Sequence, residues 1–237
     1  MEKKRTVGII LAAGRGTRIN AHGINKTALP FLGKPMIQYG VDLLLPLVDR
    51  VIIVIGTYSN SVREALKAYG NLDYAYQRKR LGTGHAVKVT LPILKTYSPS
   101  EVVVGYGDHL MFNRQATVKK LINFHRRGRS VISLLTTRHD HPDELAWGRI
   151  QRGHRGQVLG IIEQKDATLE ERQIDELNPG FYCFNYKFLC QYLRRISKSK
   201  VTNEYYLTDL IKLAVENNLK VSAFTVPFSE VGIGINR

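Results

Sequence analysis

A glycine-rich loop near the start of the 237-residue sequence carries residue types that bind phosphate groups. Its small residues, Leu11-Ala12-Ala13-Gly14, continue into Gly16 and Thr17, and two cations, Arg18 and Lys26, follow. Small residues let a ligand approach the backbone, and consecutive N–H groups can surround phosphate oxygens. The two cations would hold a triphosphate while charge develops on a departing pyrophosphate. The loop therefore predicts phosphate chemistry.

The spacing of these glycines differs from two common nucleotide-binding patterns. The sequence has no G-x-x-x-x-G-K-[ST] motif, and Ile19 occupies the position of the third glycine in the dinucleotide pattern. A Gly-x-Gly pair by itself is equally typical of a tight turn. The cations that follow the pair are what favour a phosphate site.

Asp108 is the candidate metal ligand. It follows Gly107 and the apolar run Glu101–Tyr106, which predicts a strand. Mg²⁺ prefers carboxylate and phosphate oxygens, so an aspartate at a strand end can hold it against a bound triphosphate. An aspartate here would also suit the cap of a following helix. Both roles stay open on this pattern alone.

Short apolar runs alternate with helical patterns through the first half of the chain. Strands are predicted over 6–11, 51–55, 73–76, 101–106 and 131–136, and helices over 59–69, over 115–127 and from about Pro35 and Gly84. This alternation predicts an α/β fold with a Rossmann-like, mixed but mainly parallel sheet flanked by helices on both faces. Such sheets bind ligands beyond the carboxyl ends of their strands, where the glycine-rich loop and Asp108 fall.

The second half has a different pattern. A hairpin is predicted over 148–164, a strand over 181–185, and helices over 186–197 and 208–216. Neither a linker nor a repeat interrupts the sequence. We therefore expect one domain over residues 1–237.

Two longer segments resemble the sugar-1-phosphate nucleotidyltransferase family, also called nucleotide-sugar pyrophosphorylases. The first joins the glycine-rich loop to Leu29-Pro30-Phe31-Leu32-Gly33-Lys34-Pro35-Met36. The second begins at Gln77 and is similar to the base-binding segment of the uridyltransferase domain of bacterial bifunctional N-acetylglucosamine-1-phosphate uridyltransferases. The resemblance implies that Gln77, Gly82 and Thr83 contact the base. A Gln amide both donates and accepts hydrogen bonds, which suits the imide edge of uracil.

The resemblance covers nearly the whole chain and implies further roles. Six residues are implied to contact the sugar: Tyr106, Gly107, Gly148, Glu163, Lys165 and Asn178. Asp108 and Asn236 are implied to hold Mg²⁺, and the implied catalytic residues are Arg18, Lys26 and Asp108. The implied fold is that of nucleotide-diphospho-sugar transferases. Its nucleotide-binding part is expected at about 1–110, and its sugar-binding part at about 111–237.

Several positions depart from the family pattern. Asn25 replaces a proline before the loop lysine, His109 follows the metal aspartate, and Pro179 replaces a threonine after Asn178. Asn236 is preceded by one extra residue and lies next to the end of the sequence. The acetyltransferase β-helix of the bifunctional enzymes does not follow it, so acetyl transfer is not expected.

We therefore expect a cytoplasmic enzyme that transfers a nucleoside monophosphate from an NTP to a sugar-1-phosphate. UTP is the favoured nucleotide, and N-acetylglucosamine-1-phosphate is the favoured acceptor. Two alternatives stay open. One is a nucleotidyltransferase that uses dTTP or CTP with another acceptor. The other is a catalytically weak regulatory protein that binds nucleotide sugars. Individual residues also have a purely structural interpretation. Glu163 and Lys165, for example, would suit a surface ion pair that contributes little to the stability of the fold.

The formal net charge of +15 suits polyanionic ligands. Basic clusters lie at 78–80, 126–129 and 194–200, without the aromatic and basic motif of RNA-binding modules. A solvated basic surface is therefore favoured over a nucleic-acid site. A membrane partner is not expected, because the apolar runs are too short to cross a bilayer. Cys183 and Cys190 lack a metal-ligand pattern and are predicted to be reduced thiols.

Overall fold

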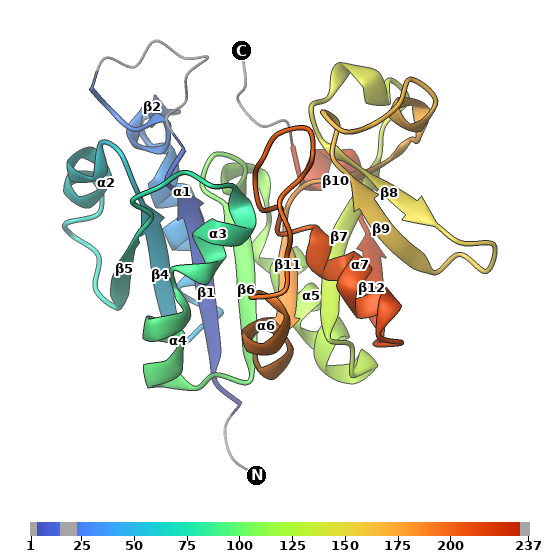
Figure 1. Cartoon of the computed structure of the whole chain (residues 1–237). Helices are drawn as coiled ribbons and strands as arrows, with labels where there is room; N and C mark the ends of the chain where they lie inside the picture. The colour runs from blue at the N-terminus through green and yellow to red at the C-terminus, as the bar shows by residue number, and fades with distance from the viewer. Residues whose placement is uncertain (1–3, 15–22, 233–237) are drawn as a thin grey trace.

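The computed structural model describes residues 4–14 and 23–232, and its centre is a ten-stranded mixed sheet (Figure 1). The strands lie in the order β5-β4-β1-β6-β11-β7-β10-β8-β9, and β12 pairs with β7. Their bounds are β1 Thr6–Ala12, β4 Arg50–Ile55, β5 Leu72–Tyr76, β6 Glu101–Tyr106, β7 Ile132–Arg138, β8 Gly148–Arg152, β9 Val158–Ile162, β10 Glu176–Asn178, β11 Tyr182–Asn185 and β12 Val221–Thr225. A separate short hairpin joins β2 (Pro30–Phe31) to β3 (Lys34–Pro35).

The first half of the sheet is parallel. Strands β5, β4, β1 and β6 are neighbours, and Ile9 of β1 lies opposite Ile52 of β4 and Val104 of β6. Runs of Val and Ile form these strands because helices cover both faces, so both sets of side chains are buried. The strands predicted here are confirmed within one or two residues. Their carboxyl ends meet at the upper edge of the sheet in Figure 1.

The second half is largely antiparallel. Strand β11 lies antiparallel between β6 and β7, and β10, β8 and β9 continue the sheet through antiparallel pairs. The predicted hairpin is confirmed as β8 and β9. Strands β2, β3, β10 and β12 were not predicted. Three of them have only two or three residues, and β12 contains Ser222 and Ala223, which carry little strand preference.

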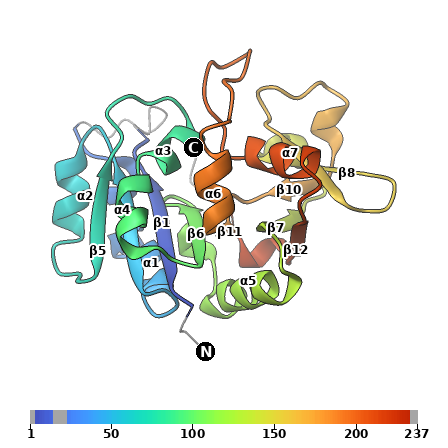
Figure 2. The ribbon, with the colours of Figure 1, turned by 60° about the horizontal axis from the view of Figure 1, so that its bottom comes forward.

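Helices cover the two faces and enclose two hydrophobic cores (Figure 2). One face carries α1 (Met36–Leu44), α2 (Ser59–Ala65) and α5 (Gln115–Gly128). The other carries α3 (Thr83–Lys88), α4 (Leu91–Tyr97), α6 (Tyr186–Tyr192) and α7 (Asp209–Glu216). None of the described helices is both long and apolar enough to span a membrane.

Two predicted helices were too long, and a third pattern forms two helices. The helix predicted over 59–69 ends at Ala65, and the one predicted over 186–197 ends at Tyr192. The pattern from Gly84 forms two helices, α3 and α4, because Pro92 lies in the first turn of α4 and lacks the N–H that a continuous helix needs. Cys183 is buried in β11 and Cys190 is half-buried in α6, and neither is in a disulfide, as predicted.

Candidate functional site

The start of the glycine-rich loop is fixed by Asn25. This side chain is fully buried, and its amide nitrogen donates to the carbonyl oxygens of Ala12 (2.9 Å) and Gly14 (3.2 Å). Its amide oxygen accepts from the backbone N–H and the hydroxyl of Thr27. Asn25 therefore ties the end of β1 to the turn that carries Lys26. A proline at this position would make none of these side-chain bonds.

Lys26 and Asp108 form an ion pair next to this loop. The Lys26 ammonium lies 2.9 Å from an Asp108 carboxylate oxygen, and Lys26 is 7% exposed. Burial acts to raise the pKa of Asp108, but electrostatic interactions with His109 and Lys26 hold it below its ordinary value. The carboxyl group is therefore ionised at neutral pH. Two of the predicted catalytic residues, 82 positions apart in the sequence, thus lie in contact.

The predicted base-binding segment forms a loop whose shape depends on Gly82. Gly82 has φ +96°, and a Cβ atom there would lie 2.5 Å from the carbonyl oxygen of Tyr205. The Gln77 amide, buried at the end of β5, donates to the Gly82 carbonyl oxygen at 3.0 Å and lies 3.1 Å from His85 Nδ1. The Thr83 hydroxyl accepts from the Leu207 N–H at 2.9 Å.

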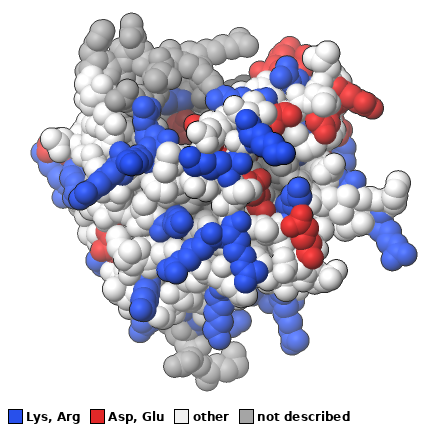
Figure 3. Space-filling model, viewed as in Figure 1, with Lys and Arg blue, Asp and Glu red and all other residues white. Residues whose placement is uncertain are grey.

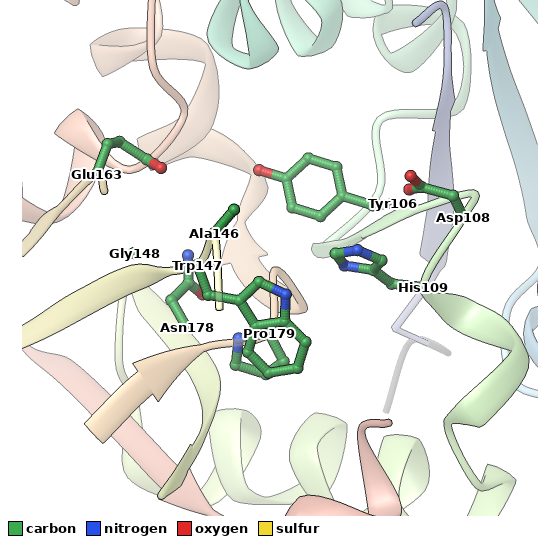
Figure 4. Close-up of a pocket in the computed structure, with 9 residues that line it drawn as sticks. All are labelled: Tyr106, Asp108, His109, Ala146, Trp147, Gly148, Glu163, Asn178 and Pro179. Atoms are coloured by element: carbon green, nitrogen blue, oxygen red, sulfur yellow. The ribbon is translucent and has the colours of Figure 1, made fainter. Parts of the chain in front are cut away.

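Two cavities that share lining residues lie at the carboxyl edge of the sheet, and Figure 4 shows the first of them. The first, about 250 Å³, is bounded on one side by Tyr106, Asp108 and His109 and on the other by Trp147, Gly148, Glu163, Asn178 and Pro179. The second, about 210 Å³, shares Tyr106 and Glu163 with the first and adds Thr83, Lys165, Glu204 and Tyr206. Residues from both halves of the sheet therefore face one continuous space.

A buried polar network supports the wall of the first cavity. Asn178 donates to the Tyr182 hydroxyl at 2.7 Å and accepts from the Gly180 N–H at 3.1 Å. Burial raises the pKa values of Tyr106 and Tyr182, so both phenols keep their protons as donors. One N–H and one lone pair of the Asn178 amide are thus used within its own strand connection, and Pro179 beside it has no N–H to offer a ligand.

Glu163 is half-buried at the junction of the two cavities. Burial raises its pKa, and the carboxylates of Asp166, Asp209 and Glu204 act in the same direction, while a bond from the Thr208 hydroxyl at 2.8 Å opposes them. The sequence left open an ion pair between Glu163 and Lys165. The two side chains do not form one in the structure. A carboxylate aimed into a cavity suits hydroxyl donors, which a sugar supplies.

Arg149 is a structural residue that sequence reasoning missed. It is 0% exposed and donates to the carbonyl oxygens of Pro142, Leu145, Trp147 and Arg172. These bonds hold the segment 142–148, which brings Trp147 and Gly148 to the cavity. An arginine in an apolar-Gly-Arg-Ile run gives no hint of its burial, since arginine is seldom buried without a carboxylate partner.

His109 stands in the wall between the predicted metal ligand and Trp147. Its ring centroid lies 5.9 Å from that of Tyr106 and 5.7 Å from that of Trp147. Its Nδ1 atom is buried without a hydrogen-bond partner among the residues that the structure describes. Leaving such a nitrogen unpaired costs about 1–3 kcal/mol.

The remaining predicted residues fall into three groups. Leu11, Ala12 and Ala13 are buried at the end of β1, and Gly14 is exposed beyond it. Gly107 does not line either cavity: a Cβ there would meet Leu11, Thr27 and Ile37, so its role in the structure is close packing. Gly16, Thr17, Arg18 and Asn236 lie outside the described residues.

Asp108 offers a donor suited to a divalent cation. It is ionised and faces the first cavity. The described residues contain no cluster of three or more His, Cys, Asp or Glu side chains that could hold a metal by themselves. Mg²⁺ bound together with substrate phosphates needs only one or two carboxylates from the protein. The donor set present fits a metal shared with a triphosphate rather than a closed metal centre.

A model of the nucleotidyl transferase family matches residues 7–229. The chain is 37% identical over 229 residues to the bifunctional protein GlmU of Exiguobacterium sibiricum, covering 96% of this chain and 49% of that protein. It is 38% identical over 238 residues to GlmU of Caldicellulosiruptor saccharolyticus, covering 100% of this chain and 50% of the relative. The chain thus spans about half the length of these relatives.

A solved structure shares the fold. A Bacillus anthracis protein assigned as a glucose-1-phosphate thymidylyltransferase superposes with a TM-score of 0.76 at 20% identity, covering 93% of this chain and 87% of that one. At this identity the likeness concerns the fold alone. The family model spans both halves of the sheet and the cavities between them, and the chain belongs to the nucleotidyl transferase family.

Proposed function

We propose that the chain transfers UMP from UTP to a sugar-1-phosphate, with N-acetylglucosamine-1-phosphate as the first candidate, and releases pyrophosphate. The observation that supports this most is the convergence on one space of three groups from distant segments. Asp108 of the Lys26–Asp108 pair lines the first cavity, Thr83 of the base loop lines the second, and Glu163 lies where the two cavities meet.

The reaction is an in-line displacement. An oxygen of the acceptor phosphate attacks the α-phosphorus of UTP, a new P–O bond forms, and the bond to the β-phosphate oxygen breaks as pyrophosphate leaves. The attacking oxygen is already anionic at neutral pH, so the step needs no general base. Catalysis then depends on placing the two phosphates and neutralising their charge.

The proposed roles follow from position. Lys26, the predicted Arg18 and the loop N–H groups after Ala13 would contact the nucleotide phosphates. Asp108, with Asn236, would hold Mg²⁺, which when bound neutralises charge on both substrates' phosphates. In the absence of substrate, the Lys26 ammonium already lies against Asp108. Binding of the phosphates would exchange part of this contact for a contact to phosphate oxygens.

The second half would hold the sugar. Glu163 would accept hydrogen bonds from sugar hydroxyls, the Gly148 backbone would face the ring, and Lys165 would lie near the acceptor phosphate. These groups line the two cavities together. Asn178 has its amide bound to Tyr182 and Gly180, so in this arrangement it would shape the pocket more than read an acetamido group.

Pyrophosphate release tests the proposal directly. Purified protein with Mg²⁺ is assayed with each of four NTPs against a panel of sugar-1-phosphates. Strong release with UTP and N-acetylglucosamine-1-phosphate is expected. Release with a different pair only would keep the reaction and reject the proposed specificity.

One alternative specificity has its own support. The commitment of Asn178 and the presence of Pro179 reduce the polar contacts available to an acetamido group. A glucose-type acceptor, with dTTP or CTP in place of UTP, is therefore the second candidate. Binding of UTP without release from any pair would favour a regulatory nucleotide-sugar-binding protein.

A further inference from the structure

Two segments that lack Asp and Glu carry much of the positive charge. Residues 74–100 and 177–203 contain ten Lys or Arg residues, three of them at 78–80 and four at 194–200. Of the 35 basic residues in the sequence, the other 25 are nearly balanced by the 20 acidic ones. These two segments therefore account for ten of the fifteen excess charges.

The fold brings the two segments together on one face. The Gly84 N–H donates to the Tyr205 carbonyl oxygen at 2.8 Å, and the Tyr186 N–H donates to the Ser100 carbonyl oxygen at 3.1 Å. Helices α3, α4 and α6 pack on the same hydrophobic core. Figure 3 shows the result: Lys and Arg side chains spread over this face, whereas Asp and Glu gather mainly toward its upper right. We call this surface, formed by α3, α4, α6 and the segments 78–80 and 193–203, the basic face.

The charges of the basic face are exposed and unpaired. All ten side chains belong to exposed residues. None of them forms an ion pair with a carboxylate among the described residues, whereas Arg50, Arg126 and Arg152 elsewhere are paired. Clustered like charges repel one another and add nothing to the stability of the fold. Their arrangement suits an anionic surface outside the molecule.

A protruding loop adds an apolar tip to this face. The loop after α6 projects outward from the body of the molecule in Figure 2. Val201 lies on it, is 68% exposed, and follows Lys198 and Lys200 in the sequence. Cations around an exposed apolar side chain are the composition of a segment that rests at a lipid interface.

Aromatic side chains are not exposed on the basic face. The exposed aromatic residues of the described chain are Tyr58, Tyr76 and Phe124. Phe124 belongs to α5, and Tyr76 lies on the side of β5 where Tyr74 packs against the opposite core. Single-stranded nucleic acids bind by stacking bases on aromatic rings along a basic track. This face therefore suits lipid headgroups better than unpaired bases.

We propose that the basic face binds the surface of an anionic membrane as a peripheral contact, with Val201 entering the headgroup layer. Each basic residue near such a surface strengthens binding about fivefold, and the attraction weakens with salt. This proposal departs from the expectation of no membrane partner, which considered only segments that could span a bilayer. The inference does not rest on the proposed reaction.

Vesicle co-sedimentation tests the role of charge. The probe is a vesicle of phosphatidylglycerol and phosphatidylcholine at a ratio of about 3:7, with pure phosphatidylcholine as the neutral control. Lys95→Glu with Lys187→Glu, on the basic face, should weaken binding at least tenfold. Lys119→Glu with Lys120→Glu, exposed on α5 at the opposite face, makes the same change in net charge and should weaken it no more than about threefold.

Tryptophan fluorescence tests the tip. The protein has one tryptophan, Trp147, which is buried and gives a constant background. In Val201→Trp, the emission of the introduced tryptophan should shift to shorter wavelength when anionic vesicles are added. Leu169→Trp, at a residue 81% exposed on the segment between β9 and β10, should not shift.

Three results would overturn the proposal: no binding of the unaltered protein to anionic vesicles at low salt, equal losses in the two double variants, or no shift for Val201→Trp. Tighter binding of a 20-nucleotide RNA than of vesicles, with the same sensitivity to Lys95→Glu and Lys187→Glu, would assign the face to nucleic acid instead. Circular dichroism of each variant checks that the fold is retained.

Discussion

The two halves of the sheet prepare their ligand edges in different ways. In the first half, the strands are parallel, and the edge is shaped by the backbone and by the conformation of glycines such as Gly82. In the second half, antiparallel strands and the segments that follow them bring the buried Asn178 and Arg149 and the half-buried Glu163 into a hydrogen-bonded wall. The first half should therefore be sensitive to added atoms, and the second to lost polar groups.

The largest expected effect is at the boundary between the halves. Asp108→Asn removes the charge that pairs with Lys26 and would hold Mg²⁺, at a cost of about 4 kcal/mol in the transition state, so kcat should fall about 10³-fold. Pyrophosphate release measures kcat, and thermal unfolding checks the fold. Asp175→Asn, at an exposed carboxylate paired with Arg138, is the control. Near-normal turnover of Asp108→Asn would remove Asp108 from the mechanism.

An added methyl group at Gly82 should weaken nucleotide binding by the first half of the sheet. Gly82→Ala places a Cβ against the Tyr205 carbonyl oxygen at a φ that side chains rarely adopt, at a cost of about 1–3 kcal/mol. KM for UTP should rise about 10- to 100-fold, with a smaller change for the sugar phosphate. Gly156→Ala has a similar positive φ in the β8–β9 turn but open space around it. It should leave KM for UTP unchanged, and a matching rise there would show a general loss of stability instead.

Loss of the Glu163 charge should weaken binding of the sugar-1-phosphate by the second half of the sheet. Glu163→Gln keeps the size of the side chain and an acceptor for Thr208, but weakens bonds to sugar hydroxyls by about 1.5 kcal/mol. KM for the sugar-1-phosphate should rise about tenfold while KM for UTP stays constant. Equal changes in both constants would mean that the two halves do not divide the substrates as proposed.

The smallest effect concerns stability behind the sugar wall. Burial raises the pKa of Asp209 to about 6, with Lys212 opposing and Asp166 adding to the rise. The native carboxyl then binds more protons than the unfolded one between about pH 4 and 6, so stability is lost as pH rises through this window. Asp209→Asn should add about 1 kcal/mol to the free energy of unfolding at pH 7, allowing for solvent screening, and little at pH 4. Urea unfolding at both pH values measures this, and an unchanged pH profile would contradict it.

Sequence reasoning succeeded where neighbouring residues in the chain determine the structure. The run of Val and Ile before Gly14 predicts a buried strand, and the pattern before Gly107 predicts that Asp108 lies at the same edge. It failed where contacts between distant parts of the chain determine the burial of a side chain or the existence of a strand. Nothing in the neighbours of Arg149 indicates that four carbonyl oxygens surround it, and the three-residue β10 is a strand only because β7 and β8 flank it.

The role of Asn25 shows a middle case. Its departure from the family pattern was visible in the sequence, but its meaning was not. An Asn side chain both donates and accepts, and here it does both, to Ala12 and to Thr27. The substitution therefore replaces the rigidity of a proline ring with hydrogen bonds.

The segment 205–208 has a consequence for how the substrates influence each other. Its backbone is bonded to the base loop at Leu81, Thr83 and Gly84, and its Thr208 is bonded to Glu163. A nucleotide that orders the base loop would therefore also order the sugar wall, so less conformational freedom is left to lose when the second substrate arrives. Positive thermodynamic coupling is the result. By linkage, a bound sugar phosphate should tighten nucleotide binding by the same factor as the nucleotide tightens the sugar phosphate.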